Sequence, residues 1–358
     1  MNELLRKNIV NLKPYSSART EFTGKADVYL DANEHYRDFV EMKDANRYPD
    51  PKATVLRKKI EEVLGLPFEH TVLGSGSDEL IDNLIRAVCT PGKDSILILP
   101  PTYGAYRVFA DINDVEVEEL PLLPSFEIDL PALERFLSKE RNERSEGRLK
   151  LLFLCSPNNP TGNSYSLETI EAVLKIFDGL VVLDEAYYDF SEGESGVSLL
   201  SKYDHLVVLR TLSKAWGLAS ARVGIAVGSR ELVEVINKIK YPYNLGTPSQ
   251  ALALRALENA EAVKRSLDEI KRERSRLSGA LAAFGCVRIV YPSDANFLLL
   301  KVDDATRLYT FLTENGTIIR NRTKERGLEN CVRITVGSQA ENDILLEGFE
   351  AYMRKYYA

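Results

Sequence analysis

Apolar runs of four or five residues recur along the first two thirds of the chain, and helical patterns separate several of them. The main runs lie at 95–99, 151–155, 180–183, 206–209 and 223–227. Each run is apolar at nearly every position, which is typical of strands buried on both faces. The pattern therefore predicts an α/β fold with a mainly parallel sheet covered by helices, in which ligands bind beyond the carboxyl ends of the strands.

Further elements are expected around this core. Short strands are predicted at 71–73 and 115–120 and from Tyr29, where YLDANE begins. Helices are predicted at about 53–64, 79–88 and 167–177, followed by a long helical stretch at about 249–284. Beyond it, NFLLLKV at 296–302 and CVRITVG at 331–337 predict strands, with helices near 304–314 and 341–352. This last part predicts a smaller α/β domain.

The domain organisation follows from the break at Pro242, Gly246 and Pro248. We expect a large domain over residues 29–247 and a small C-terminal domain over residues 248–358. Residues 1–28 show little periodicity and are expected to form an N-terminal arm that packs with the small domain.

Composition places the 358-residue chain among ordinary globular proteins, with 44% hydrophobic and 28% charged residues. The net charge of -7 makes a general nucleic-acid binder a poor interpretation. The N-terminus lacks an apolar signal segment and no apolar run is long enough to span a membrane, so we expect a cytoplasmic protein. No metal site is expected, because the four cysteines form no CxxC pair and the three histidines are isolated.

Two nucleotide-binding interpretations fail on their motifs. Asp184 ends an apolar strand as a magnesium-binding aspartate would, but no GxxxxGK[ST] loop accompanies it. GSGSDE at 74–79 is close to a dinucleotide-binding fingerprint, but Glu79 stands where a glycine is required. The chain also has no GxSxG motif.

A set of side chains at predicted strand ends fits pyridoxal phosphate better. Lys214 lies between an apolar strand and an apolar run containing glycine, where burial would lower its pKa and make it a nucleophile. Thr211, Ser213 and Arg222 are candidates to hold a phosphate, and so is the turn before the helix at 79–88. Asp184 needs a cationic partner, which a pyridinium nitrogen would be. Taken singly, the hydroxyls are also explained as loop caps and the turn as an ordinary helix cap.

Three segments resemble fold type I aminotransferases: Asn159-Pro160-Thr161-Gly162, Asp184 with Tyr187, and Thr211-Leu212-Ser213-Lys214 with Arg222. More narrowly, Pro14-Tyr15, Asn33-Glu34, Arg47-Tyr48-Pro49, GSGSDE, PPTYGAY, PYNLGTPSQ and CVRITVG resemble the histidinol-phosphate aminotransferases. The resemblance implies a pyridoxal 5'-phosphate enzyme of histidine biosynthesis. Its reaction would convert histidinol phosphate and 2-oxoglutarate to imidazole-acetol phosphate and L-glutamate.

The resemblance also implies roles for residues of the large domain. Lys214 would bind the cofactor covalently and move the substrate proton, while Asp184 would keep the pyridine nitrogen protonated. Asn159 and Tyr187 would contact the phenolic oxygen, and Tyr103 would stack on the ring. The cofactor phosphate would be held by the backbone of Ser77 and Asp78, by Thr211, Ser213 and Arg222, and by Tyr48 from the other subunit of a homodimer.

Substrate binding is expected mainly on the small domain. In VRITV at 332–336 the period of two aims Arg333 away from the core. By resemblance, Arg320 and Arg333 would bind the substrate phosphate and the carboxylates of glutamate, whereas Tyr15, Asn33 and Tyr243 would line the side-chain pocket. The chain departs from the family pattern at two places. The family often has a proline soon after Asn33-Glu34, where this chain has His35-Tyr36, and it has Gly-Leu or Gly-Ile before the arginine, where this chain has Ser220-Ala221.

Three other functions use similar residues. An aromatic amino-acid aminotransferase and a threonine-phosphate decarboxylase would share the scaffold and the arginines. A non-enzymatic pyridoxal-phosphate-dependent regulator would need an added DNA-binding region, and the 28-residue arm is too short for one. The aminotransferase of histidinol phosphate is the preferred hypothesis.

Overall fold

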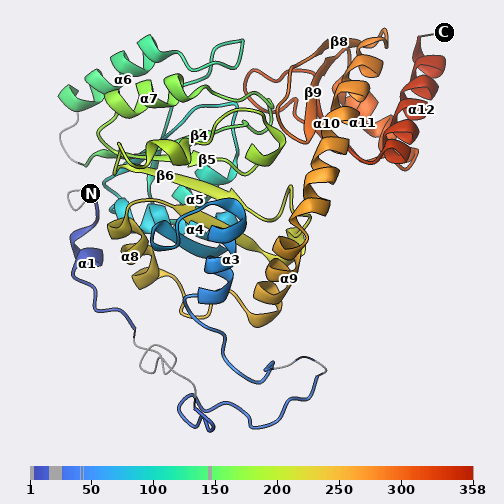
Figure 1. Ribbon diagram of the computed structural model, residues 1–358. Helices are drawn as coiled ribbons and strands as arrows, with labels where there is room; N and C mark the ends of the chain where they lie inside the picture. Colours follow the sequence, from blue (N-terminus) through green and yellow to red (C-terminus); the bar gives the residue numbers. More distant parts are fainter. Residues whose placement is uncertain (1–3, 16–25, 41, 43, 144–146, 358) are drawn as a thin grey trace.

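Two β-sheets organise the computed structural model, which describes residues 4–15, 26–40, 42, 44–143 and 147–357 (Figure 1). The larger sheet has seven strands in the order β1-β7-β6-β5-β4-β2-β3. Only β7 runs antiparallel to its neighbours, so the predicted fold class is confirmed. The strands are β1 Thr71–Ser75, β2 Ser95–Ile98, β3 Glu116–Glu119, β4 Leu149–Cys155, β5 Leu180–Asp184, β6 Leu206–Thr211 and β7 Val223–Val227.

Helices bury both faces of this sheet, which explains why its central strands are apolar throughout. In β4, Leu151 and Phe153 pack against α4 (Gly76–Val88), α5 (Ala105–Ile112) and α8 (Arg230–Ile239). Leu152 and Leu154 face the other side, where α6 (Leu130–Glu143) and α7 (Leu167–Ile176) cover the sheet. A third cluster packs α3 (Thr54–Leu64) and α9 (Thr247–Glu258) against β1 and β7. Successive residues of these strands face opposite sides of the sheet, and both sides are buried. A polar side chain at either position would therefore need a buried hydrogen-bond partner.

The first described residues of the N-terminal arm lie on the large domain. Leu4 and Leu5 are buried in the cluster formed with α4 and α8, and α1 (Lys7–Val10) follows them. The backbone N–H of Arg6 donates to the carbonyl of Ala87 at 2.9 Å. Residues 4–10 thus contact the large domain, and the expected packing of the arm on the small domain does not apply to them. Residues 16–25 lie outside the described residues.

The smaller sheet has four antiparallel strands in the order β10-β11-β9-β8. These are β8 Val287–Val290, β9 Phe297–Val302, β10 Arg320–Asn321 and β11 Cys331–Thr335. Helices α10 (Ala260–Ala282), α11 (Ala305–Glu314) and α12 (Gln339–Tyr356) bury one face of it, including Val332 and Ile334. Phe297 and Leu299 point the other way and pack into clusters shared with the large domain. The alternation predicted for 332–336 is confirmed, with Arg333 on the side facing the large domain.

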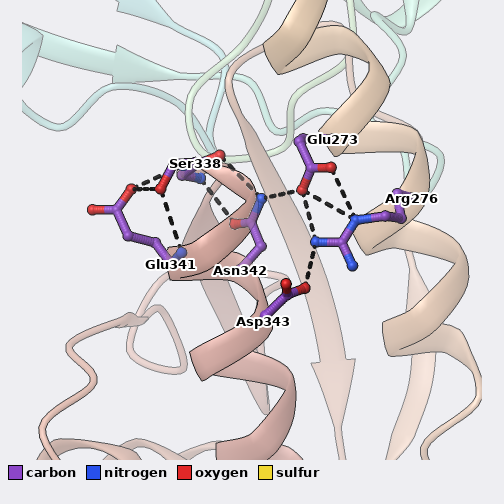
Figure 2. A network of polar contacts seen from close by, with 7 residues as sticks. Glu273, Arg276, Ser338, Glu341, Asn342 and Asp343 are labelled. Atoms are coloured by element: carbon purple, nitrogen blue, oxygen red, sulfur yellow. Dashed lines mark hydrogen bonds and ion pairs between the residues drawn. The ribbon is translucent and has the colours of Figure 1, made fainter.

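A polar network joins α10 to the start of α12 (Figure 2). Asn342 is 2% exposed, and its amide donates to Glu273 Oε2 at 2.8 Å and to the carbonyl of Gly337 at 3.0 Å. Its Oδ1 accepts from the backbone N–H of Gly337 at 3.0 Å. Ser338 and Glu341 form a capping box at the start of α12. Arg276 on α10 forms ion pairs with Glu273 and with Asp343, the residue that follows Asn342. Because α12 begins four residues after β11, this network fixes the strand that carries Arg333.

Several expectations for single elements need correction. The strand expected from Tyr29 is absent, because residues 26–40 find no neighbouring strand among the described residues, and Leu30 is 91% exposed. The helical stretch expected at 249–284 is two helices that meet at Asn259. Helix α4 begins at Gly76 and not at Glu79. Helices α5, α6 and α8 and strands β8 and β10 were not predicted. In the described part of the chain, every helix is too short or too polar to cross a bilayer.

Candidate active site

A cavity of about 500 Å³ opens where β4, β5 and β6 end, between the two sheets. Strand β7 is antiparallel, so its start, and not its end, lies at this edge and brings Arg222 to the cavity. Most of the predicted site residues line it: Ser77, Asp78, Tyr103, Asn159, Asp184, Tyr187, Thr211, Ser213, Lys214, Arg222, Arg320 and Arg333. The sequence prediction of a ligand site beyond the strand ends thus corresponds to a single cavity.

Lys214 follows β6 and opens on the cavity. Its side chain is exposed there and not enclosed, although the surrounding walls desolvate the amine and lower its pKa. The guanidinium of Arg333 acts in the same direction. The Nζ atom lies 5.5 Å from the ring centroid of Tyr187. A lysine with a lowered pKa holds more of the neutral amine at neutral pH, which is the form that attacks a carbonyl.

Asp184 ends β5 and is 3% exposed. Its Oδ2 accepts from the hydroxyl of Tyr106 at 2.7 Å and its Oδ1 from the backbone N–H of Ala186 at 3.1 Å. Both donors are uncharged, and burial raises the pKa of the carboxyl to about 6 despite them. A cation placed in the cavity beside Asp184 would restore its ionised form.

Tyr106 was not among the predicted site residues. Its ring is fully buried and stacks on Phe153 with centroids 4.5 Å apart. Its position within PPTYGAY is the only signal in the sequence, since a tyrosine on an apolar helix face otherwise indicates an ordinary core residue. Tyr106 orients the carboxylate of Asp184 from beneath the cavity.

An anion cradle forms where α4 begins. Gly76 has a φ of +78°, and a Cβ atom there would lie 2.4 Å from Nη2 of Arg222. Arg222 donates to Asp78 Oδ2 at 3.2 Å and to Ser213 Oγ at 3.4 Å. The backbone N–H groups at the start of α4, the Ser213 hydroxyl and the Arg222 guanidinium thus converge, as binding of a phosphate requires.

The Thr211 hydroxyl has partners inside the loop. It donates to the carbonyl of Val223 at 3.2 Å and accepts from the N–H of Ser213 at 3.1 Å. These contacts match the loop-cap interpretation of this hydroxyl. They also hold Ser213 beside Arg222.

Three further groups surround the space between Lys214 and Asp184. Tyr103 donates to Asp78 Oδ1 at 3.2 Å, and Tyr187 packs edge-on against Phe297 with centroids 5.1 Å apart. Burial raises the pKa of both tyrosines, so they remain protonated donors. The Oδ1 of Asn159 accepts a hydrogen bond from Arg333, which leaves the amide NH₂ as a donor.

Two charged residues that the sequence analysis did not select also line the cavity: Arg322 and Glu325. They pair with each other at 2.9 Å in the loop after β10. The sequence RNRTKER at 320–326 is typical of an ordinary charged loop. The two-residue spacing of Arg320 and Arg322 nevertheless indicates that they share a side if the chain is extended there.

Four predicted residues lie away from the cavity in this single chain. Tyr15 is 75% exposed, and Asn33 is also exposed. Tyr48 is half exposed and stacks on Tyr243 with ring centroids 4.5 Å apart. Within the described ranges, no group of three or more histidine, cysteine, aspartate or glutamate side chains is arranged to hold a metal.

Comparisons with known proteins identify relatives of this chain over most of its length. The family model described as aminotransferase class I and II matches residues 20–349. A histidinol-phosphate aminotransferase of Christiangramia forsetii is 45% identical over 352 residues, covering 98% of this chain and 97% of that protein. The crystal structure of the histidinol-phosphate aminotransferase from Clostridium acetobutylicum has a TM-score of 0.78 and 26% identity, covering 87% of this chain and 92% of that one. That from Sinorhizobium meliloti in complex with pyridoxal-5'-phosphate has the same fold, with a TM-score of 0.79 and 24% identity over 87% of this chain and 84% of that one.

Proposed function

Because the chain belongs to the class I and II aminotransferases, we propose that it transfers the amino group of histidinol phosphate to 2-oxoglutarate. The products are imidazole-acetol phosphate and L-glutamate. The observation that carries this proposal is the 45% identity to a histidinol-phosphate aminotransferase over nearly the full length of both chains. The four free, buried cysteines fit a reducing cytoplasm as its location.

The residues of the cavity fit pyridoxal 5'-phosphate, the cofactor of this family. The hydrogen-bond donors to buried Asp184 are uncharged, so its ionised carboxylate needs a cationic partner to be stable. A protonated pyridine nitrogen would be such a partner. The cradle at Gly76, Ser213 and Arg222 fits the cofactor phosphate. When bound, the cofactor provides an aldehyde that links to an amine and a ring that accepts electrons from the substrate Cα.

The side chains of the cavity then divide the work. Lys214 would hold the cofactor through its amine, and the same amine, when free and neutral, would serve as the base for the proton on the substrate Cα. Its lowered pKa favours the neutral base. Asp184 keeps the proton on the pyridine nitrogen, and Asn159 and Tyr187 donate to the phenolic oxygen. Tyr103 covers the ring.

Arg320 and Arg333 are proposed to bind the substrate phosphate and the carboxylates of glutamate. They lie directly opposite each other on β10 and β11 and both line the cavity. Guanidinium groups bind phosphate and carboxylate in the same forked geometry, so one pair suits both halves of the reaction. Contacts of Tyr15, Asn33 and Tyr243 with the substrate side chain stay a prediction.

A homodimer is proposed from the segment 26–40, which lies below α3 and α9 in Figure 1. Its described part exposes Val28, Leu30, Tyr36, Phe39 and Val40, each by more than 60%. Exposure of this many apolar side chains marks a surface that another chain covers. In the dimer, Tyr48 would reach the cofactor phosphate of the partner.

The dimer is tested by the mass of the protein in solution. Wild type should have twice the chain mass of 40.2 kDa, and Leu30→Glu should shift the mass towards the monomer and weaken cofactor binding. Val108→Glu, which is 54% exposed on α5, is the matched control and should leave the mass unchanged. A monomeric wild type would refute the proposal.

The reaction is tested by single-turnover rates with histidinol phosphate, phenylalanine and glutamate. The first and last should react fastest, and Lys214→Ala should abolish both turnover and borohydride fixation of the cofactor to the chain. Faster reaction with phenylalanine would make the protein an aromatic aminotransferase. Release of carbon dioxide from threonine phosphate without 2-oxoglutarate would make it a decarboxylase.

A further inference from the structure

We propose that Arg322 is a third ligand of the substrate phosphate, held in place by Glu325, and that it matches the cavity to a substrate with two negative charges. The inference rests on the proposed function, because histidinol phosphate is the substrate that carries the phosphate.

The backbone places Arg322 on the same side as the two arginines already assigned. Its N–H donates to the carbonyl of Cys331 at 2.8 Å, which continues the pairing of β10 with β11 by one residue. Arg320 stands opposite Arg333 in the same ladder. Because residues two apart on an extended chain share a side, and opposite residues of an antiparallel pair do too, the three guanidinium groups face one cavity.

Such a cluster is unfavourable without an anion. Like charges placed opposite each other across strands are destabilising, and arginine cannot relieve the repulsion by losing a proton. Glu325 offsets only part of it, with Oε1 2.9 Å from Nη1 of Arg322. The three arginines and Glu325 together leave a net charge of +2 on this side of the cavity.

The pairing of Arg322 is also incomplete. The side chain is 14% exposed, and its Nε is buried without a hydrogen-bond partner among the described atoms. A buried donor left unpaired is destabilising, because it has lost its water without gaining another partner. A phosphate offers three acceptor oxygens, so a small rotation of the guanidinium toward the ligand would pair the whole fork.

The charge of the ligand then decides its fit. A phosphate monoester carries close to two negative charges above its second pKa of about 6. The carboxylate of phenylalanine carries one, which leaves a positive charge of the arginine cluster unmatched. Arg322 thus adds a preference for the phosphorylated substrate to the attraction that Arg320 and Arg333 provide.

The test compares histidinol phosphate with histidinol, which lacks only the phosphate. Binding to the cofactor-loaded enzyme is followed by the visible spectrum of the cofactor in wild type, Arg322→Gln, Arg322→Lys and Arg326→Gln. Arg326 is the matched control, since its side chain is 65% exposed near Glu119 and lies outside the cavity. Loss of a charged hydrogen bond corresponds to about 1.5–3 kcal/mol, or about 10- to 150-fold in Kd.

Arg322→Gln should raise the Kd of histidinol phosphate by that factor and leave the Kd of histidinol unchanged. Arg322→Lys should recover part of the loss, because it restores the charge and not the fork. Arg326→Gln should match wild type. The Kd of histidinol divided by the Kd of histidinol phosphate should also rise between pH 5.5 and 7.5 in wild type, because the phosphate loses its second proton over this range. This ratio should rise less in Arg322→Gln.

Two results would overturn the assignment of Arg322 alone: an unchanged Kd for histidinol phosphate in Arg322→Gln, or equal weakening of histidinol phosphate and histidinol, which indicates a structural role. Failure of wild type to turn over histidinol phosphate would instead overturn the proposed function, and the assignment of Arg322 with it.

Discussion

Replacing Gly76 by alanine tests the phosphate cradle through a single methyl group. Gly76 begins α4 with a φ of +78°, a conformation that side chains rarely adopt. The added Cβ would lie 2.4 Å from Nη2 and 3.0 Å from Cζ of Arg222. Because these atoms end a flexible side chain, the clash is relieved when the guanidinium moves out of the cradle and the backbone stays in place.

The two effects of Gly76→Ala have separable magnitudes. The left-handed backbone conformation should lower the free energy of unfolding by about 1–2 kcal/mol. Displacement of Arg222 should remove a charged hydrogen bond to the cofactor phosphate, which corresponds to about 1.5–3 kcal/mol of binding free energy, or about 10- to 150-fold in Kd.

Gly65→Ala is the matched control. Gly65 ends α3 with a φ of +66°, but a Cβ there meets nothing within 4 Å. Both variants should therefore lose similar stability in urea denaturation of the cofactor-free protein, and only Gly76→Ala should bind pyridoxal 5'-phosphate more weakly in an absorbance titration. Equal cofactor affinity in the two variants would refute the assignment of Arg222 to the phosphate.

Two further variants test the buried polar groups. For Asp184, burial raises the pKa from 3.8 to about 6, so its favourable contribution to stability is present below about pH 4 and is lost as the pH rises through about 6. Asp184→Asn should therefore stabilise the cofactor-free protein by up to about 3 kcal/mol more at pH 7 than at pH 4, and an equal difference at both pH values would contradict this. Asn342→Ala should lower the free energy of unfolding by about 2–3 kcal/mol, because Glu273 and Gly337 lose buried partners. Asp343→Ala, which removes only a half-exposed ion pair with Arg276, should lower it by less than about 1 kcal/mol in the same urea titration, and equal losses would show that Asn342 does not anchor α12.

Burial explains how much of the fold the sequence predicts. The runs of β4, β5 and β6 are apolar at nearly every position because helices cover both faces, and this is visible without a structure. The antiparallel direction of β7 relative to β6 cannot be predicted, because an apolar run has the same pattern in a parallel and in an antiparallel strand. The strand expected from Tyr29 fails for a related reason: a strand requires a neighbouring strand, and the local pattern carries no information about neighbours.

The same distinction applies to the site. Asp184 and Lys214 were predictable because each follows an apolar strand, and strand ends meet at one edge of the sheet. Tyr106 was not, because it reaches Asp184 from a helix face that otherwise reads as core. Arg322 was not, because a charged loop gives no sign that it closes over a cavity. Their roles depend on tertiary contacts that no local pattern encodes.

The cavity is built from two separately hydrogen-bonded sheets, and this has a consequence for how such enzymes diversify. The groups that fit the cofactor belong to the seven-stranded sheet and its loops, whereas the arginines proposed to bind the substrate belong to a hairpin of the four-stranded sheet. Among the described contacts, the hydrogen bond from Arg333 to Asn159 joins the two sets directly. Changes in the β10–β11 hairpin can therefore alter which amine is accepted while the cofactor site keeps its chemistry, provided that position 333 remains an arginine.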